Sequence, residues 1–320
     1  MKNLISPENL INKLLREERV ALFMHVRPDG DTIGSTLALS FALNKKGVKT
    51  EVFCADALPS RFLSFKGTKD VKTELFGEYT ALVAVDSADV TRLGDFALYF
   101  ANHKNTYSID HHVSNPNFAK VNYVKDSAAN CENVYEIITT AGIEIDSDIS
   151  NLLALGIVTD TGNFKHKNVT AKTLSIASCL VEKGADLNYI VFKTITEQSK
   201  QRAKLFGLVM SKLRFFLEDR LCIATVFDSQ IKESGALPDE TEGFIDFLTG
   251  ITGVEVSVCM LETEKNVYKI SFRSKKTDVS AVASVFGGGG HVLASGCKIH
   301  DEYEEVVDKI YSAVKRFIED

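Results

Sequence analysis

Residues 20–35 have the sequence VALFMHVRPDGDTIGS, and the order of patterns within this stretch decides the fold. Val20–Val26 is a continuous apolar run of the kind found in buried parallel strands. A short loop with proline and glycine follows, and Ile33–Lys46 has the apolar spacing of a helix that ends at a glycine. A buried strand followed directly by a helix predicts an α/β fold with a parallel sheet that helices cover on both faces.

The same alternation continues through the first half of the chain. Further apolar runs predict strands, and the intervening amphipathic stretches predict helices. The strands are expected at Thr50–Cys54, Ala81–Val85 and Thr106–Ile109, and the helices at Glu132–Ala141, Asp148–Thr159 and Ala171–Lys183. We therefore expect residues 1–190 to form a Rossmann-like domain.

The second half has a different pattern. Residues 191–216 are helical in pattern and mixed in charge, and we interpret them as a connector. Residues 217–320 predict a smaller α+β domain. Its expected elements are alternating strands at Leu221–Phe227, Val254–Leu261 and Val267–Arg273, a glycine run, and a helix at Tyr303–Ile318.

The charge balance, the cysteines and the lack of long apolar runs argue against several classes of protein. The 320 residues carry 37 Lys and Arg against 43 Asp and Glu, a formal net charge of −6. This balance argues against a partner such as long duplex DNA, because such binding depends on basic side chains, but it leaves room for a small phosphorylated substrate. The six cysteines form no C-x-x-C pair. With no signal peptide and no membrane-spanning apolar run, we expect a soluble, cytoplasmic protein with no membrane contact.

Carboxylates and imidazoles follow the first predicted strand. His25 lies at its end, and Asp29 and Asp31 lie two residues apart in the loop before the helix. Gly30 between them permits a tight bend, so both carboxylates could point into one space. The alternative is an ordinary turn with an N-cap aspartate, which a lone D-G-D pattern favours.

Three later segments also place carboxylates or imidazoles after a predicted strand or helix. Asp86 follows the strand Ala81–Val85, at the edge where open α/β sheets bind ligands, although it could also be a cap. Asp110-His111-His112 follows the next strand, and the alternative there is a pair of surface histidines. Asp160 lies in the polar turn after a helix.

Together these residues predict a metal centre. His25, Asp29, Asp31, Asp86, His111 and Asp160 provide nitrogen and oxygen ligands without a cysteine, a set that suits Mn²⁺ or Mg²⁺ better than structural zinc. Four carboxylates in one cleft would repel each other without cations. Two divalent ions about 3.5–4 Å apart would relieve that repulsion and activate a water between them for phosphoester hydrolysis. Asp86 is the natural bridging ligand.

These motifs, in this order, resemble the DHH phosphoesterase superfamily over about the first 190 residues. The D-H-H triplet at 110–112, the H-x-x-x-D-x-D of 25–31, Asp86 and the T-D-x-G of 159–162 carry the resemblance. It implies that His25 and Asp29 bind a first Mn²⁺, that Asp31, His111 and Asp160 bind a second, and that Asp86 bridges them. It also implies that Asp110 orients its neighbours and that His112 contacts the substrate phosphate, so we expect Asp86, Asp110 and His112 to serve catalysis.

The second domain contains a candidate phosphate site. Arg273 and Ser274 end a predicted strand, and Gly287–Gly290 precede His291. Four glycines in a row are unfavourable in a helix or strand, but their N–H groups can approach an anion closely. The alternative is a flexible linker. The pattern resembles the DHH-associated C-terminal domain, which implies that Arg273, Ser274, Gly288, Gly289, Gly290 and His291 bind substrate.

The resemblance implies an enzyme of the bifunctional oligoribonuclease and pAp phosphatase type. We expect two Mn²⁺ per chain, or Mg²⁺ in their place, and short RNA or small nucleotide phosphates such as 3′-phosphoadenosine 5′-phosphate (pAp) as partners. A phosphodiesterase of cyclic di-AMP or pApA is the alternative, and a nucleotide-binding protein without activity is a remote one. A homodimer is left open.

Two departures from the family pattern are visible, and neither removes a ligand. Arg27 stands where many relatives have Asn, and residues 128–132 lack the usual Ser/Thr run, so substrate preference could differ. Of the remaining histidines, His103 and His300 are expected at the surface, and His166 could line the cleft.

Overall fold

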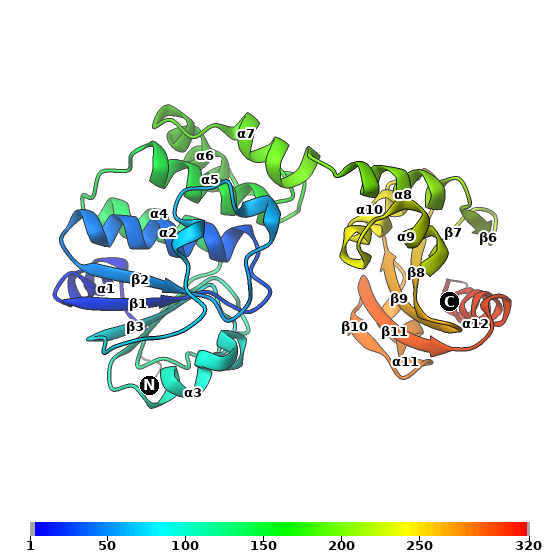
Figure 1. The fold of residues 1–320 in the computed structure, drawn as a ribbon, viewed down its shortest axis with the longest axis horizontal. Helices are drawn as coiled ribbons and strands as arrows, with labels where there is room; N and C mark the ends of the chain where they lie inside the picture. The colour runs from blue at the N-terminus through cyan, green and yellow to red at the C-terminus, as the bar shows by residue number, and fades with distance from the viewer. Residues whose placement is uncertain (1–3, 319–320) are drawn as a thin grey trace. The chain divides into compact units, whose positions relative to one another are not determined.

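The computed structural model describes residues 4–318, and the chain divides into two compact units between Glu197 and Gln198 (Figure 1). The division lies inside the stretch 191–216 that we interpreted as a connector. Within that stretch, a short helical turn belongs to the first unit and a regular helix to the second. The two units are described separately below.

The first unit is an α/β domain with the following elements. Its strands are β1 (Arg19–Phe23), β2 (Lys49–Phe53), β3 (Ala81–Val85), β4 (Thr106–Asp110) and β5 (Val121–Val124). Its helices are α1 (Pro7–Leu14), α2 (Gly30–Lys45), α3 (Ala97–Asn102), α4 (Asn130–Thr140), α5 (Ser147–Asp160), α6 (Ala171–Glu182) and α7 (Leu187–Val191), with short helical turns η1 (Ser60–Phe62), η2 (Thr68–Asp70), η3 (Val90–Phe96) and η4 (Phe192–Thr196).

The five strands form one parallel sheet in the order β2-β1-β3-β4-β5. Strand β2 pairs with one side of β1, and β3 pairs with the other side, so the direction in which strands are added reverses at β1. In open α/β sheets this reversal creates a crevice at the carboxyl ends of the central strands, which is where ligands bind. The topology therefore directs attention to the residues that follow β1, β3 and β4.

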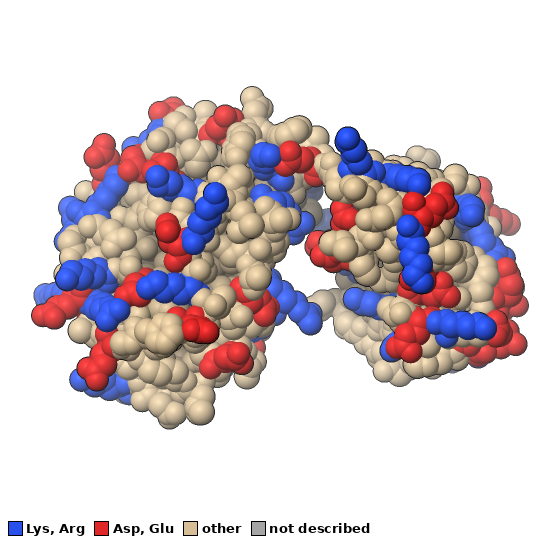
Figure 2. All heavy atoms as spheres, viewed as in Figure 1, with Lys and Arg blue, Asp and Glu red and all other residues tan. Residues whose placement is uncertain are grey.

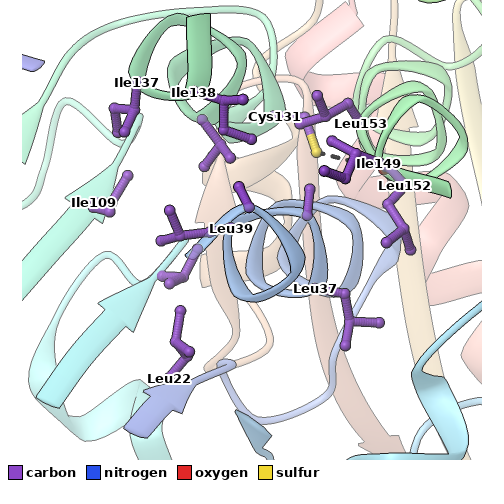
Figure 3. Close-up of a cluster of buried hydrophobic side chains, with 14 of the residues drawn as sticks. Leu22, Leu37, Leu39, Ile109, Cys131, Ile137, Ile138, Ile149, Leu152 and Leu153 are labelled. Atoms are coloured by element: carbon purple, nitrogen blue, oxygen red, sulfur yellow. Dashed lines mark hydrogen bonds between the residues drawn. The ribbon is translucent and has the colours of Figure 1, made fainter. Parts of the chain in front are cut away.

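Helix α2 is the centre of the first core. Thirteen of its 16 residues are buried, and these include polar side chains such as Asp31, Thr32 and Ser35 as well as the apolar ones. Figure 3 shows α2 enclosed by sheet residues such as Leu22 and Ile109 on one side and by Ile138 and Leu152 of the neighbouring helices on the other. The opposite face of the sheet carries an aromatic cluster that includes Phe23. Helices thus cover both faces, which confirms the predicted class.

The second unit has a mixed sheet in the order β10-β11-β9-β8-β7-β6, in which only β7 and β8 are parallel. Its strands are β6 (Arg214–Phe216), β7 (Leu221–Val226), β8 (Val256–Glu264), β9 (Val267–Ser274), β10 (Gly289–His291) and β11 (Ala294–His300). Its helices are α8 (Lys200–Met210), α9 (Asp228–Ser234), α10 (Phe244–Thr249), α11 (Val279–Ser284) and α12 (Tyr303–Ile318), with the turn η5 (Pro238–Thr241).

Helices cover both faces of this second sheet as well. Helices α11 and α12 pack on one face, and α8, α9 and α10 pack on the other. Every residue of β7 is consequently buried, so the polar and apolar alternation that we expected there is wrong. The mixed sheet and its helices confirm an α+β domain.

One predicted strand boundary also differs from the structure, and one strand was not expected. The first strand ends at Phe23, not at Val26, because the chain turns away from the sheet and the Val26 N–H donates to the carbonyl of Arg92 instead. We did not expect a strand at the glycine run, yet Gly289–His291 form the edge strand β10. At Gly290 of this strand a Cβ atom would lie 2.6 Å from the carbonyl oxygen of Ala294, so the close approach of β10 to β11 favours glycine at that position.

Candidate metal centre

Three strand ends bring the predicted ligands together at the carboxyl edge of the first sheet. His25 lies two residues after β1, Asp86 directly follows β3, and His111 directly follows β4. Asp29 is the N-cap of α2, Asp31 lies in its first turn, and Asp160 is the last residue of α5. Residues that are up to 135 positions apart in sequence therefore share one space (160 − 25).

His25, Asp29 and Asp86 form a first set of ligand atoms that lie within 4.8 Å of one another. Nε2 of His25 is 3.5 Å from Oδ2 of Asp29 and 3.6 Å from Oδ2 of Asp86. Nδ1 of the same ring lies 2.9 Å from the carbonyl oxygen of Val26. With a proton on Nδ1 donated to this carbonyl, Nε2 keeps its lone pair for a cation.

Asp31, His111 and Asp160 form a second set within the same limit. Nε2 of His111 is 3.9 Å from Oδ2 of Asp31 and 3.6 Å from Oδ2 of Asp160. Its Nδ1 lies 3.1 Å from the carbonyl oxygen of Ser127, so this ring too can direct Nε2 into the site. Asp86, His111 and His112 form a third group within the same limit, so the division of ligands that the family resemblance implies stays a prediction.

Asp86 faces both sets. Its Oδ2 is directed to His25, and its Oδ1 lies 3.4 Å from Nε2 of His111. Oδ1 is buried and has no hydrogen-bond partner among the described residues. Asp86 also has a left-handed backbone conformation, with φ of 56°, which is strained for a residue other than glycine. A buried carboxylate oxygen without a donor is a site that a cation would satisfy.

The electrostatics of the cluster also favour cations. Burial, together with the neighbouring carboxylates, raises the pKa of Asp86 and of Asp31 above the usual range. Burial, with repulsion from Asp31 and Asp29, raises the pKa of Asp160 to about 9. Burial acts to raise the pKa of Asp29 as well, but the contact with His25 and the hydrogen bonds from two main-chain N–H groups together hold that pKa below its usual value. The repulsion would disappear with divalent cations present, and the oxygen and imidazole donors fit Mn²⁺ or Mg²⁺.

Asp31 is held in place by the start of helix α4. The main-chain N–H of Asn130 donates to Oδ2 at 2.5 Å, and that of Cys131 donates to Oδ1 at 2.9 Å. The unsatisfied N–H groups of a helix N-terminus favour a negative charge at this point. The segment 128–132, noted for its missing Ser/Thr run, therefore still supports the site, through its backbone.

Asp110 and His112 form a pair beside the ligands. Oδ1 of the buried Asp110 is 2.8 Å from Nδ1 of His112. Burial acts to raise the pKa of Asp110, but the hydrogen bonds from His112 and Asn115 outweigh it and hold the pKa below the usual value. The bond to Asp110 in turn raises the pKa of His112. The second ring nitrogen of His112 is left for another partner.

The sequence interpretation missed two side chains at this edge. Arg92 of η3 places Nη2 3.1 Å from Nδ1 of His25. Asn115 donates from Nδ2 to Oδ2 of Asp110 at 2.6 Å. An asparagine a few residues after the D-H-H triplet was a visible signal for the second contact, whereas nothing in the sequence links Arg92 to His25.

The histidines outside the motifs have varied environments. His300 is exposed, as predicted. His103 is only partly exposed, and its Nδ1 and Nε2 lie 2.9 Å and 3.1 Å from the carbonyl oxygens of Asn105 and Tyr79, which accept from whichever ring nitrogen carries a proton. His166 is exposed and places Nδ1 3.1 Å from the carbonyl oxygen of the ligand Asp160.

The candidate phosphate residues of the second unit lie around β9, β10 and β11. Arg273 is partly exposed on β9 and its Nη1 donates to the carbonyl of Phe272, while Ser274 is buried and its hydroxyl accepts from Lys276. The Gly288 N–H donates to the carbonyl of Ala283, so it is not free for an anion and the expectation of exposed N–H groups is wrong at this position. Gly289, Gly290 and His291 are exposed along an edge strand.

Charged side chains are mixed on the surface. Figure 2 shows Lys and Arg interspersed with Asp and Glu over the visible face of each unit. That face carries no continuous basic surface of the kind that long nucleic acids need. Within residues 4–318, no helix combines the length and the apolar character that crossing a membrane requires.

Two family models match the chain, one in each unit. The model described as the DHH family, N-terminal domain, matches residues 19–157, and the DHHA1 domain model matches residues 218–320. All the predicted metal ligands except Asp160 lie within the first match, and Arg273 to His291 lie within the second.

Several relatives are similar to this chain over nearly its whole length. The bifunctional oligoribonuclease and PAP phosphatase NrnA of Thermus thermophilus is 31% identical over 306 residues, which cover 93% of this chain and 90% of the relative. The protein of the same name from Bacillus subtilis is 26% identical, over 96% of this chain and 98% of the relative. The crystal structure of an exopolyphosphatase-related protein from Bacteroides fragilis matches with a TM-score of 0.88 and 25% identity, covering 97% of this chain and 96% of that one.

Proposed function

The chain belongs to the DHH phosphoesterase family and is a hydrolase of phosphate ester bonds, and we propose that it hydrolyses short oligoribonucleotides and pAp with two divalent cations. The observation that carries this proposal is the position of Asp86, whose two oxygens face two separate sets of ligand atoms. The named activities of the relatives from Thermus thermophilus and Bacillus subtilis support the choice of substrates.

We assign His25 and Asp29 to one cation and Asp31, His111 and Asp160 to the other, with Asp86 shared. Divalent cations held there supply Lewis acidity to the phosphate and to the attacking water. The family dependence on metals fits this assignment, and Mn²⁺, with Mg²⁺ as the alternative, is the identity that we propose from the oxygen and imidazole donors.

The residues beside the cations then act on the substrate. His112, held by Asp110 through Nδ1, can direct its other ring nitrogen to a phosphate oxygen and donate a hydrogen bond as negative charge develops there. Because the bond to Asp110 raises its pKa, His112 keeps this proton more readily than an isolated histidine would. We propose that Arg273, Ser274, Gly288, Gly289, Gly290 and His291 of the second unit bind substrate, with Gly288 acting through the shape of the backbone.

We also propose a cellular compartment and binding partners for the enzyme. The six cysteines are all free, which suits a reducing, cytoplasmic environment. Short RNA and small nucleotides are the proposed partners, since few phosphates need to be neutralised. A homodimer stays open, and size-exclusion chromatography with light scattering measures it directly.

A substrate panel tests the proposed function. Rates are measured with Mn²⁺ and with Mg²⁺ on pAp, RNA of two to five nucleotides, pApA and cyclic di-AMP. We expect hydrolysis of pAp and of short RNA. A rate confined to pApA or cyclic di-AMP would instead establish the alternative phosphodiesterase, and no turnover of any substrate would refute the proposal.

A pair of variants tests the metal assignment. Asp86→Asn keeps the size of the side chain, and asparagine tolerates the left-handed backbone, but it removes the shared charge. We expect it to reduce hydrolysis of both substrates at least about 1,000-fold with the fold intact. Asp95→Asn makes the same change at an exposed aspartate of the same unit and should leave both rates unchanged.

A further inference from the structure

Asn115 is a buried side chain in the loop after β4, and it is hydrogen-bonded to residues other than the six ligands assigned above. Its Nδ2 donates to Oδ2 of Asp110 at 2.6 Å and to the carbonyl oxygen of Ser87 at 3.1 Å. Its Oδ1 accepts from the N–H of Asn117 at 2.7 Å, which fixes the orientation of the amide. The donor side of Asn115 therefore faces the carboxylate of Asp110.

Asp110 contacts His112 as well as Asn115. Its second oxygen, Oδ1, lies 2.8 Å from Nδ1 of His112. The terminal torsion of an aspartate is broad, so a carboxylate held at one oxygen only can rotate. Because Asn115 fixes Oδ2, the carboxylate cannot rotate freely and the position of Oδ1 is fixed too. The imidazole that bonds to Oδ1 therefore has a defined orientation.

His112 has a competing carboxylate nearby. Nδ1 of His112 is 3.8 Å from Oδ1 of Asp86, the same oxygen that faces His111. A ring released from Asp110 could therefore move to Asp86 and compete with a cation for this oxygen. The contact from Asn115 to Asp110 opposes this movement, because it keeps the preferred acceptor of His112 in place.

We propose that Asn115 is a positioning residue that acts through Asp110 to hold His112 toward the substrate phosphate and away from Asp86. The proposal rests on the proposed function, since it requires His112 to act on a bound phosphate ester. Loss of Asn115 should then slow the chemical step while leaving the metal ligands in place.

A second buried asparagine provides a matched control. Asn122 on β5 accepts through Oδ1 from the N–H of Ala119 at 3.1 Å and donates through Nδ2 to its carbonyl at 2.7 Å. Asn115→Asp and Asn122→Asp each keep one acceptor oxygen and replace the donating NH2 group with a second carboxylate oxygen, without creating a cavity. Both variants thus place a carboxylate at a buried position and lose donated hydrogen bonds, but only Asn115→Asp loses the bond to Asp110 that holds His112.

The experiment compares the two variants at saturating Mn²⁺ with pAp as substrate. For Asn115→Asp we expect kcat to fall about 10–100-fold, with KM changed less than about threefold and the rise in melting temperature on Mn²⁺ addition retained. Asn122→Asp should keep kcat within about twofold. A wild-type kcat in Asn115→Asp, or an equal loss in both variants, would overturn the proposal.

A double variant separates positioning from a general structural effect. If Asn115 acts through His112, adding Asn115→Asp to His112→Ala should cause no further loss of kcat. A second, multiplicative loss of 10-fold or more would contradict the proposal. If Asn115→Asp does not fold, Asn115→Ser enters the same cycle with the same criteria. An inactive wild-type protein would refute the proposed function itself, whereas an active wild type with an unaffected Asn115 variant would refute only the positioning role.

Discussion

Gly156 of helix α5 approaches Asp31 so closely that a Cβ atom on Gly156 would lie 2.4 Å from Oδ1 of the carboxylate. The same Cβ would lie 2.3 Å from Sγ of Cys131. The close packing of α2, α4 and α5 thus depends on a missing side chain directly beside a proposed ligand. This contact links the stability of the core to the geometry of the site.

Gly156→Ala should therefore damage both properties. We expect the free energy of unfolding to fall by about 1–3 kcal/mol, because the core must expand to accept the methyl group. The displaced Asp31 should also weaken Mn²⁺ binding. Urea unfolding and Mn²⁺ titration by calorimetry measure the two effects.

Gly207 of helix α8 supplies the control for this change. A Cβ there would meet no atom within 4 Å, so Gly207→Ala should stabilise the protein by up to about 1 kcal/mol through helix propensity alone. Equal effects of the two substitutions would show that the contact between Gly156 and Asp31 is unimportant.

The raised carboxylate pKa values predict how the metal-free protein responds to pH. The pKa of Asp160 is about 9 in the folded chain, against about 3.9 for an unperturbed aspartate. Between these values the folded state binds more protons than the unfolded state. Its stability should therefore fall as the pH rises from about 4 to about 9, by at most about 1.4 kcal/mol per pH unit for one proton.

Melting curves from pH 5 to 9, recorded in EDTA and in Mn²⁺, check this dependence. The stabilisation by Mn²⁺ should grow with pH, because the carboxylates must lose their protons to bind a cation. Asp160→Asn should flatten the dependence in EDTA. A wild-type melting temperature that is independent of pH in EDTA would argue against a repulsive carboxylate cluster.

Arg27 has an unfavourable backbone conformation next to the site. Its φ is 55°, its side chain is exposed, and its N–H donates to Oδ2 of Asp56 at 2.7 Å. Arg27→Asn should raise the free energy of unfolding by about 1 kcal/mol, because asparagine tolerates this conformation better. The loss of a cation two residues from His25 and Asp29 should raise the KM for pAp about two- to fivefold.

Denaturant titration and steady-state kinetics test both parts of this prediction. Lys69→Asn removes an exposed cation from a position with ordinary φ and controls for the general loss of charge. It should change neither quantity. If Lys69→Asn raised the KM as much as Arg27→Asn did, the effect would belong to net charge and not to the location of Arg27.

The glycine run of the second unit offers two substitutions with opposite consequences. A Cβ on Gly288 would lie 2.2 Å from the carbonyl oxygen of Gly296, whereas a Cβ on the exposed Gly289 would meet no atom within 4 Å. Gly288→Ala should destabilise the unit by about 1–3 kcal/mol. Gly289→Ala should leave the melting temperature unchanged but raise the KM for pAp at least about threefold, by keeping a phosphate away from the edge strand. An unchanged KM would remove β10 from the proposed substrate site.

Local patterns were sufficient to predict the fold class of the first unit and to nominate its candidate ligands, but they did not indicate the helix α1 or the strand β5. Continuous apolar runs indicated the strands β1, β3 and β4, and their polar successors His25, Asp86 and His111 fell at one edge because parallel strands share a direction. Local signals were weaker for β10, since a glycine run has no apolar pattern and its pairing with β11 depends on a partner strand.

The tertiary structure alone decided how the ligands are oriented and held. Hydrogen bonds to Asp31 come from main-chain groups 99 and 100 residues away, and no side-chain pattern records which N–H groups a helix will direct there. The contact between Arg92 and His25, which are 67 residues apart in the chain, likewise exists only once separate elements have packed. Sequence by itself determined which chemical groups are available at the edge of the sheet. Packing determined the distances and directions between them, because these depend on contacts between residues remote in the chain.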